Sequence, residues 1–331
     1  MKKVVLGLSG GVDSAVAAKL LMNEGYDVHG LYLDIGTEEA RRDAVATAEF
    51  LNVPLTVVSI ADELEEHVCR PFVECYLRGE TPNPCMMCNP KVKFKSLVDH
   101  ADRIGAEYIA TGHYARAKDG ALYKGMPSND QSYLLSRILR SQLERLILPL
   151  GEFEKKQVRE MAEGFGIPVA NKPDSMEICF IPDKDYIGWI RGRSEVPGPG
   201  NLVFDGKVIG THEGIYRYTV GQRWPGLYNE RKLYVSAIDP EKNRVILALW
   251  EDLFKTEVHA REMNWLIDVP EDDIRASVRV RHTKWENPAC TVHVNGGGID
   301  VFCDEAVRAP APGQSAVIYD GDRVLGGGYI Y

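Results

Sequence analysis

Short apolar runs alternate with amphipathic stretches over the first half of the chain. The apolar runs predict buried strands at residues 4–8, 28–33, 55–60 and 108–111. The amphipathic stretches predict helices at residues 14–23, 38–51, 61–78 and 94–104. Strands that alternate with helices favour an α/β fold in which helices cover both faces of a parallel sheet.

The pattern changes after residues 191–200, whose sequence RGRSEVPGPG predicts a linker. The following segments are short and strand-like, and Asp-Pro, Asn-Gly-Gly-Gly and Asp-Gly-Asp turns separate them. Examples are residues 232–238, 244–249, 277–281, 291–294 and 316–319. We therefore predict a catalytic domain followed by two small, mainly β modules. Their boundaries are expected at 1–190, 200–252 and 256–331.

Composition is that of a globular cytosolic protein. The chain has 331 residues, of which 44% are hydrophobic and 26% charged. No apolar run approaches the ~20 residues of a membrane span, and no signal peptide is visible, so we expect a cytoplasmic enzyme without a membrane partner. Seven cysteines in a chain of this size indicate core fillers, metal ligands or reactive thiols rather than a disulfide framework. The formal charge of −9 argues against nucleic acid as a partner, but net charge is only a mean, and a local basic stripe can still bind phosphates.

A glycine-rich loop, Ser9-Gly10-Gly11-Val12-Asp13-Ser14, joins the first predicted strand to the first predicted helix. Such a loop brings backbone N–H groups and the positive end of the helix dipole to a phosphate. Its serines can donate hydrogen bonds, and Asp13 can hold Mg²⁺. The predicted ATP site comprises Gly7, Leu8, Ser9, Gly10, Gly11, Val12, Asp13 and Ser14. Leu33 and Gly112 join it, because both end strands of the same predicted sheet.

Two better-known phosphate loops are excluded. A Walker A loop requires a lysine before its final serine or threonine, and a dinucleotide-binding loop requires Gly-x-Gly-x-x-Gly. The sequence SGGVDS instead resembles the signature of the PP-loop ATP-pyrophosphatase superfamily, whose members adenylate an oxygen of the substrate and then displace AMP.

Two cysteines lie on a predicted loop, in the sequence TPNPCMMCN at residues 81–89. A zinc site would need a second Cys-x-x-Cys or a histidine pair at suitable spacing, and neither is present. The loop therefore presents the thiols of Cys85 and Cys88 near an adenylating site. A third cysteine, Cys179, follows in the sequence DSMEICF at residues 174–180.

Together these motifs resemble the tRNA-specific 2-thiouridylase family over nearly the whole chain. Further matching segments are TGHYAR (111–116), DQSY (130–133), YTVGQR (218–223), PGQ (312–314) and LGGG (325–328). The resemblance implies a C-terminal β-barrel and a tRNA-uridine 2-sulfurtransferase. In that activity, ATP adenylates the C2 oxygen of the wobble uridine, pyrophosphate leaves, and sulfur displaces AMP.

The resemblance also assigns residue roles. Cys179 would carry a persulfide received from a sulfur-relay protein, and Cys88 would be its partner nucleophile. Residues expected to contact tRNA are Asn83, Pro84, Cys85, His113, Asn129, Asp130, Gln131, Arg281, His282 and Gln314. The expected cofactors are ATP and Mg²⁺.

Two departures from the family pattern leave alternatives open. Cys85 stands where relatives commonly carry aspartate, so Cys85, Cys88 and Cys179 could instead ligate a [4Fe–4S] cluster that binds sulfide. Such a cluster could also serve thiolation at another tRNA uridine. Residues 34–42 are shorter than in familiar members, which puts any contact made there in doubt. Two rival functions are a PP-loop ligase of the amidotransferase type and an RNA-binding module without catalysis.

The remaining cysteines and a basic segment have structural explanations as well. Cys69 and Cys75, six apart on one predicted helix, are expected to be packing or surface residues, and Cys290 and Cys303 are expected to fill the core. Alternation places Arg275, Arg279 and Arg281 on one face of a predicted strand, beside His282 and Lys284. This face is either an ordinary solvated surface or, with tRNA as substrate, a phosphate contact.

Overall fold

The computed structural model describes the chain except for residues 171–177, 182 and 283–286. It divides into two compact units, which are described separately below. The first unit comprises residues 1–68, 85–176 and 322–325. The second unit comprises residues 69–84, 177–321 and 326–331.

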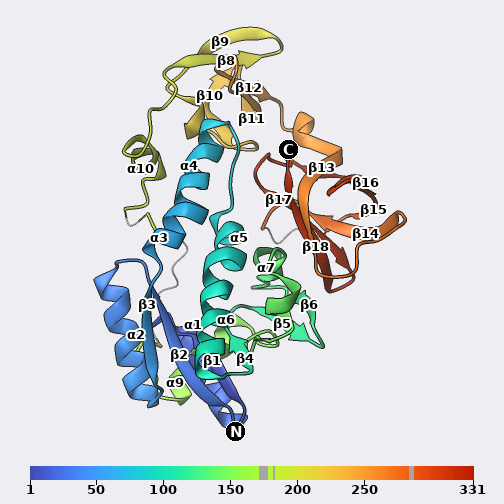
Figure 1. Ribbon diagram of the computed structural model, residues 1–331. Helices are drawn as coiled ribbons and strands as arrows, with labels where there is room; N and C mark the ends of the chain where they lie inside the picture. Colours follow the sequence, from blue (N-terminus) through green and yellow to red (C-terminus); the bar gives the residue numbers. More distant parts are fainter. Residues whose placement is uncertain (171–177, 182, 283–286) are drawn as a thin grey trace. The chain divides into compact units, whose positions relative to one another are not determined.

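A parallel sheet of five strands forms the centre of the first unit, in the order β3-β2-β1-β4-β7 (Figure 1). The strands are β1 (Lys3–Gly7), β2 (Asp27–Asp34), β3 (Leu55–Ser59), β4 (Tyr108–Ala110) and β7 (Leu146–Ile147). Four of them lie where the apolar runs predicted strands, which confirms the parallel sheet. The two-residue β7 was not predicted, because it is too short to show a periodic pattern.

Side-chain alternation along β1 and β2 explains why helices cover both faces of this sheet. Val4, Leu6 and Val28 share one core with α1 (Val12–Asn23), α2 (Glu38–Leu51) and α9 (Lys155–Gly164). The next residue in β2, His29, points to the other face, where its ring lies 5.0 Å from that of His100 in α6 (Phe94–Ile104). The predicted α/β architecture is therefore confirmed.

The helix predicted at 61–78 is interrupted by a π-helical segment. It consists of α3 (Ala61–Leu64), the π-helical residues Glu65–Cys69 and α4 (Arg70–Leu77). Pro71 lies in the first turn of α4 and has no N–H to offer the carbonyl of residue 67, which disfavours a regular helical ladder at that point.

The thiol segment, predicted as a loop, is also helical. It forms α5 (Pro84–Cys88) and continues into π-helical residues Asn89–Lys93. Pro84 is compatible with this because proline is tolerated at the first helical position. The loop prediction was therefore wrong, and Cys85 and Cys88 lie about one helical turn apart.

The second unit contains two β modules. The first is a five-stranded sheet in the order β10-β11-β12-β8-β9. Its strands are β8 (Gly200–Phe204), β9 (Lys207–His212), β10 (Arg223–Tyr228), β11 (Arg231–Asp239) and β12 (Arg244–Ala248). Its core contains Leu202, Leu233 and Val245.

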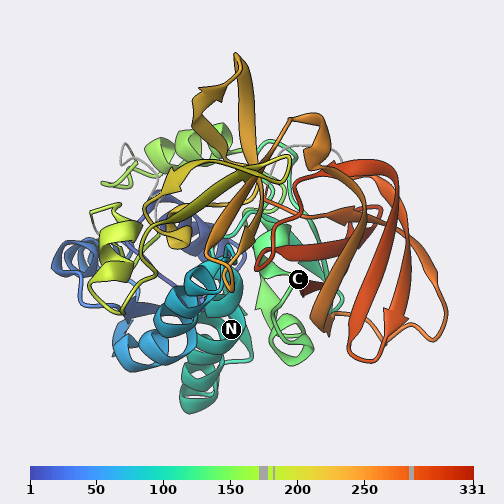
Figure 2. The same cartoon turned by 90° about the horizontal axis from the view of Figure 1, so that it is seen from above.

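A closed β-barrel follows, as predicted. In the part of the chain that the structure describes, six strands run in the order β13-β16-β15-β14-β17-β18, and β13 pairs with β18 to close the barrel (Figure 2). These strands are β13 (Phe254–Trp265), β14 (Ile274–Arg279), β15 (Ala289–Asn295), β16 (Gly298–Arg308), β17 (Ser315–Asp320) and β18 (Arg323–Ile330). The first residues of β18 belong to the first unit, where Arg323 pairs with Tyr123 of β6 (Ala121–Lys124), the partner strand of β5 (Ala115–Lys118).

The His29–His100 pair should make the free energy of unfolding depend on pH. His100 is 4% exposed, and neither of its ring nitrogens has a hydrogen-bond partner among the described residues. Burial lowers the pKa of both imidazoles below their usual value of 6.5. The unfolded chain therefore binds more protons below that pH, so stability is complete above pH 6.5 and is lost as the pH falls toward the folded-state pKa values.

Wild type should lose free energy of unfolding as the pH falls from neutral to mildly acidic. We expect this loss to be smaller in His100→Leu, which has no imidazole to protonate at this position. Urea denaturation at several pH values measures this slope, and His67→Leu, at a partly exposed position, is the control. The interpretation is wrong if His100→Leu and wild type lose stability in parallel.

Candidate active site

The phosphate loop connects β1 to α1 and contains eight predicted ATP-binding residues in sequence, Gly7–Ser14. Gly10 adopts φ +76°, and a Cβ at this position would lie 2.6 Å from the backbone nitrogen of Ala44 in α2. Only glycine satisfies both conditions. Close packing against α2 therefore shapes the turn that presents the loop's N–H groups.

Serine hydroxyls fix the loop from within. The Ser14 hydroxyl donates to the Gly11 carbonyl at 3.0 Å and accepts the Ser9 N–H at 3.2 Å. The hydroxyls of Ser9 and Ser14 lie 3.2 Å apart. Ser9 is exposed, so its hydroxyl and the N–H groups at the start of α1 are available to a phosphate.

The strand order explains why other residues join this loop. The chain builds β1, β2 and β3 in one direction and then crosses to the other side of β1 to form β4. Ligands bind at such a switch point, beyond the carboxyl ends of the strands. Leu33 lies near the end of β2, and Gly112 follows β4. A Cβ on Gly112 would lie 3.0 Å from the Asp13 carbonyl carbon, so the absence of a side chain allows β4 to approach the start of α1.

Asp13 has partners that the sequence did not reveal. The Lys155 Nζ lies 2.7 and 2.8 Å from the two carboxylate oxygens of Asp13, and the Tyr114 hydroxyl donates to one of them at 2.7 Å. Lys155 is the first residue of α9, which packs against α1. The side chains of Asp13 and Lys155 are 32% and 24% exposed, so this ammonium group lies beside the loop and can also reach an anion.

His113 follows Gly112 and is held in place by two contacts. Its Nδ1 lies 2.8 Å from the Thr111 hydroxyl, and its ring stacks on Phe94 at a centroid distance of 6.2 Å. Although the side chain keeps partial exposure, the pKa of His113 is well below 6.5, because its ring is desolvated and Lys93 is nearby. A neutral imidazole can donate or accept a hydrogen bond but supplies no positive charge at neutral pH.

The predicted tRNA-binding residues Asn129, Asp130 and Gln131 form a braced turn. Gln131 accepts the Tyr114 N–H at 2.9 Å and donates its own N–H to the Tyr114 carbonyl at 2.7 Å. Asp130 accepts the Ser132 N–H and hydroxyl, each at 3.0 Å. Asn129 donates to the Phe153 carbonyl at 3.4 Å. The turn is thus connected through Tyr114 to Asp13.

The seven cysteines fall into two groups by burial. Cys69, Cys75, Cys290 and Cys303 are buried, which confirms their packing role. Burial raises the pKa of Cys75 and Cys290 to about 12 and that of Cys303 to about 11. Cys85 and Cys179 are exposed, and Cys88 is half-buried.

The cysteines assigned to sulfur chemistry belong to different units, Cys85 and Cys88 to the first and Cys179 to the second. The motif before Cys179 begins with Asp174 and Ser175, which lie outside the described residues. Within the described ranges, no group of three His, Cys, Asp or Glu side chains is arranged to hold a metal ion. The disulfide, persulfide and cluster assignments therefore stay predictions.

The basic segment differs from the predicted strand. β14 ends at Arg279, so Arg281 lies beyond the strand and does not share its alternation. Arg275 pairs with Asp304 at 2.6 Å, and Arg279 donates to Asn287 at 3.0 Å. Arg281 donates to the carbonyl oxygens of Ala309 and Val220. The prediction that three arginines share one strand face was therefore wrong. His282 is exposed, and Lys284 lies outside the described residues.

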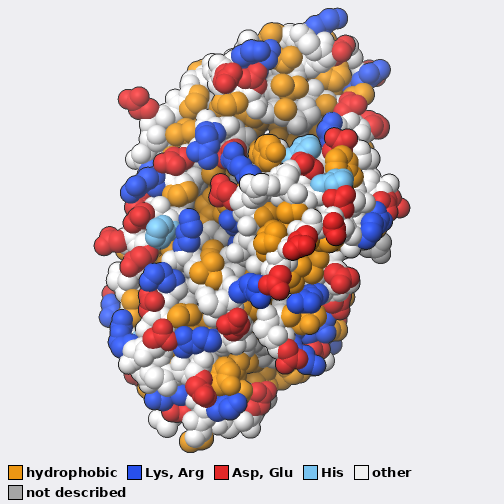
Figure 3. All heavy atoms as spheres, turned by 45° about the vertical axis from the view of Figure 1, so that its right-hand side comes forward, with side chains coloured by type: hydrophobic (Ala, Val, Ile, Leu, Met, Phe, Trp, Pro, Cys, Tyr) orange, Lys and Arg blue, Asp and Glu red, His pale blue; other side chains and the backbone are white. Residues whose placement is uncertain are grey.

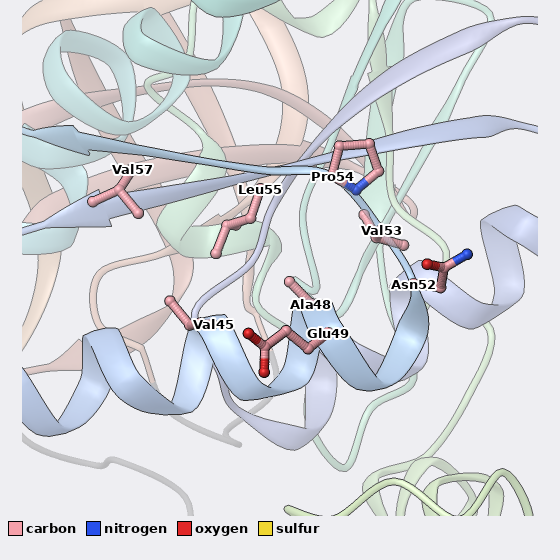
Figure 4. Close-up of a pocket in the computed structure, with 8 residues that line it drawn as sticks. All are labelled: Val45, Ala48, Glu49, Asn52, Val53, Pro54, Leu55 and Val57. Atoms are coloured by element: carbon pink, nitrogen blue, oxygen red, sulfur yellow. The ribbon is translucent and has the colours of Figure 1, made fainter.

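Gln314 is not part of the phosphate loop, and the pocket between α2 and β3 includes no residue of that loop. Gln314 is in the second unit, where its Nε2 donates to the Thr81 carbonyl at 2.8 Å. A pocket of about 550 Å³ opens between α2 and β3 (Figure 4). Its lining contains no predicted site residue and is formed by Val45, Ala48, Glu49, Asn52, Val53, Pro54, Leu55 and Val57. Among the helices that the structure describes, none is long and apolar enough to cross a membrane.

Comparison with known proteins covers the whole chain. Three family models match in succession: the tRNA methyl transferase HUP domain at residues 2–183, the tRNA methyl transferase PRC-barrel domain at 193–248 and the aminomethyltransferase β-barrel domain at 255–330. A solved 4-thiouridine synthetase–RNA complex with bound ATP aligns at 21% identity with a TM-score of 0.38, covering 58% of this chain and 50% of that one.

Two curated relatives carry the name tRNA-specific 2-thiouridylase MnmA. The protein from Syntrophotalea carbinolica is 42% identical, with 99% of this chain and 98% of that protein covered. The protein from Clostridioides difficile is 39% identical with the same coverage. The chain therefore belongs to the tRNA-specific 2-thiouridylase family.

Proposed function

We propose that this chain is a tRNA-uridine 2-sulfurtransferase that uses ATP to form 2-thiouridine at the wobble position of tRNA anticodons. The observation that carries the proposal is family membership over 99% of the chain. It is supported by the phosphate loop, in which Gly10 adopts positive φ and the hydroxyls of Ser9 and Ser14 lie within hydrogen-bond distance. The three domains at 1–190, 200–252 and 256–331, and a cytoplasmic location, are part of the same proposal.

The proposed reaction has two steps. The C2 oxygen of uridine attacks the α-phosphorus of ATP, and the bond to pyrophosphate breaks. A sulfur nucleophile then attacks C2, and the C2–O bond breaks so that AMP leaves with the oxygen. The base must leave its stack to reach such a site. The neutral His113 and the side-chain amide of Gln131, both in the first unit, suit hydrogen bonding to its exposed edge.

The nucleotide end of the site would be polar and anion-binding. The N–H groups of Gly10 and Gly11 and the Ser9 hydroxyl would hold phosphate oxygens at the start of α1. Mg²⁺ would bind the Asp13 carboxylate, which fits a hard cation and retains partial exposure. Because Lys155 contacts both oxygens of that carboxylate, we expect its ammonium group to move to a phosphate when ATP binds.

Two sulfur routes use the same cysteines differently. In one, Cys179 would carry a persulfide received from a sulfur-relay protein. The Cys88 thiolate would attack the Cys179 sulfur, the persulfide S–S bond would break, and the terminal sulfur would leave as hydrosulfide, which then attacks C2. A thiol reductant would reduce the resulting Cys88–Cys179 disulfide and restore both thiols. In the other, Cys85, Cys88 and Cys179 would hold a [4Fe–4S] cluster, which would supply sulfide when bound. Cys85 distinguishes the two, because only the second route needs it.

The function itself is tested by incubating the purified protein with ATP, tRNA and sulfide under anaerobic conditions. We expect 2-thiouridine in the digested tRNA, together with AMP and pyrophosphate. The Asp13→Ala variant should form none of these three products. An amidated product would favour the ligase alternative, and tRNA binding without turnover would favour the non-catalytic module.

Replacing Lys155 should weaken ATP binding selectively. Loss of a charge-assisted hydrogen bond predicts a Kd for ATP that is about ten- to a hundredfold higher in Lys155→Met, measured by calorimetry. The control is Lys156→Met, because the Lys156 side chain is 85% exposed and pairs only at 3.7 Å with Glu160 in the same helix. Equal ATP affinities in the two variants would show that Lys155 only neutralises Asp13.

Replacing Cys85 should separate the sulfur routes. If a cluster forms, anaerobically prepared Cys85→Ser should lose iron and thiolate tRNA at least about tenfold more slowly, because a thiolate ligand is missing. Iron quantitation and single-turnover thiolation measure both, and Cys75→Ser, at a buried thiol outside the site, is the control. An iron-free Cys85→Ser protein with normal activity would exclude the cluster route.

A further inference from the structure

Thr81, three residues before α5 with its Cys85 and Cys88 thiols, is held through its backbone by a loop of the barrel. The Thr81 N–H donates to the Pro312 carbonyl at 2.7 Å, and the Gln314 Nε2 donates to the Thr81 carbonyl at 2.8 Å. Both backbone polar groups of Thr81 therefore bind the same loop. We name Thr81, Pro312, Gly313 and Gln314 the Thr81 clamp.

The barrel side of the clamp is itself fixed. The Gly313 N–H donates to the Ile330 carbonyl at 2.9 Å, and the Ile330 N–H donates to the Gln314 carbonyl at 2.8 Å. The flanking residues Ala311 and Ser315 are fully buried. The backbone of Gly313 and Gln314 is therefore held by Ile330, and the Gln314 side chain extends from this held backbone to Thr81.

Gly313 explains why the two backbones can meet. It adopts φ +87°, a conformation that favours glycine, and a Cβ there would lie 3.0 Å from both the nitrogen and the carbonyl carbon of Thr81. Any side chain would separate the loop from Thr81. The contacts with Thr81 therefore explain why Gly313 and Gln314 occupy these positions, without any contact with RNA.

Neighbouring residues add two further attachments. The Glu80 carboxylate, 14% exposed, accepts from Arg78 at 2.9 Å and from Arg261 of β13 at 3.1 Å. Gly79 lies so close to β11 that a Cβ on it would approach the Ile238 side chain to 2.6 Å. The backbone between α4 and Thr81 is therefore held by β11 of the five-stranded sheet in the second unit as well as by the barrel.

We propose that Gln314 is a positioning residue that acts through Thr81 on the segment Asn83–Cys88, rather than by touching the target base. Pro82 and Pro84 each fix a φ angle, which removes two of the backbone torsions between the clamped Thr81 and the Cys85 thiol. Holding Thr81 restricts where the following thiols can lie. This inference rests on the proposed function, in which that segment takes part in sulfur transfer.

The test uses two variants that open the clamp differently. Gln314→Met removes the donor to Thr81 and keeps a side chain of similar length. Gly313→Ala leaves Gln314 intact and places a Cβ against Thr81. The matched control is Gly321→Ala, because Gly321 also has positive φ, +55°, but a Cβ there meets nothing within 4 Å. Thermal melting identifies any variant that fails to fold.

The first measurement is alkylation by iodoacetamide without tRNA, followed by mass spectrometry, with the exposed Cys179 as internal reference. We expect the half-buried Cys88 in both clamp variants to react up to about fivefold faster, the limit set by losing one hydrogen bond of ~1 kcal/mol, whereas Cys85 is already exposed. Gly321→Ala should react like wild type. Unchanged rates in both folded clamp variants would overturn the proposal.

The second measurement separates positioning from base contact. We expect the single-turnover thiolation rate of Gln314→Met to fall by about tenfold or more, with the Kd for tRNA within about twofold of wild type. A raised Kd with unchanged alkylation would assign Gln314 to the base and overturn the proposal. If wild type thiolates no tRNA, the proposed function fails, whereas the alkylation result still decides whether the clamp positions the thiols.

Discussion

The Asp13 carboxylate joins three parts of the first unit that are far apart in sequence. It lies in the first turn of α1, where the helix dipole favours a negative group, and it binds Lys155 at the start of α9 and the hydroxyl of Tyr114. Tyr114 in turn is bonded through its backbone to Gln131. The phosphate loop and the turn expected to meet tRNA therefore share one network. A change in the partners of Asp13 on nucleotide binding would therefore reach the turn that we propose contacts tRNA.

The sequence was sufficient for features set by local patterning and insufficient for those set by distant partners. Apolar runs predicted four strands of the sheet, and the glycine-serine loop was correctly predicted to join the first strand to the first helix. Lys155 could not be found this way, because its partner Asp13 lies 142 residues earlier and a helix usually starts with charged residues. Two prolines suggested a loop around Cys85, although proline is compatible with a first helical turn. Arg281 was assigned to a strand that ends before it, since strand ends depend on pairing rather than composition.

Burial divides the cysteines by chemical use. A thiol reacts as its thiolate, and a low-dielectric surrounding disfavours that charge. The raised pKa values of Cys75, Cys290 and Cys303 therefore make these thiols poor nucleophiles at neutral pH. Cys85, Cys88 and Cys179 retain contact with solvent, where an incoming sulfur donor can reach them. In a protein that handles sulfur, this division protects the core thiols from exchange.

The charge distribution indicates how an acidic chain could select tRNA. On the face drawn in Figure 3, basic side chains are interspersed with acidic ones. Arg275 is paired with Asp304, and Arg281 is bonded to backbone carbonyls, so phosphate binding by either would require giving up an existing partner. Affinity from counterion release grows with the number of phosphates neutralised. Because Arg275 and Arg281 already have partners, we expect short-range contacts to an unstacked base, rather than these two side chains, to supply selectivity for tRNA.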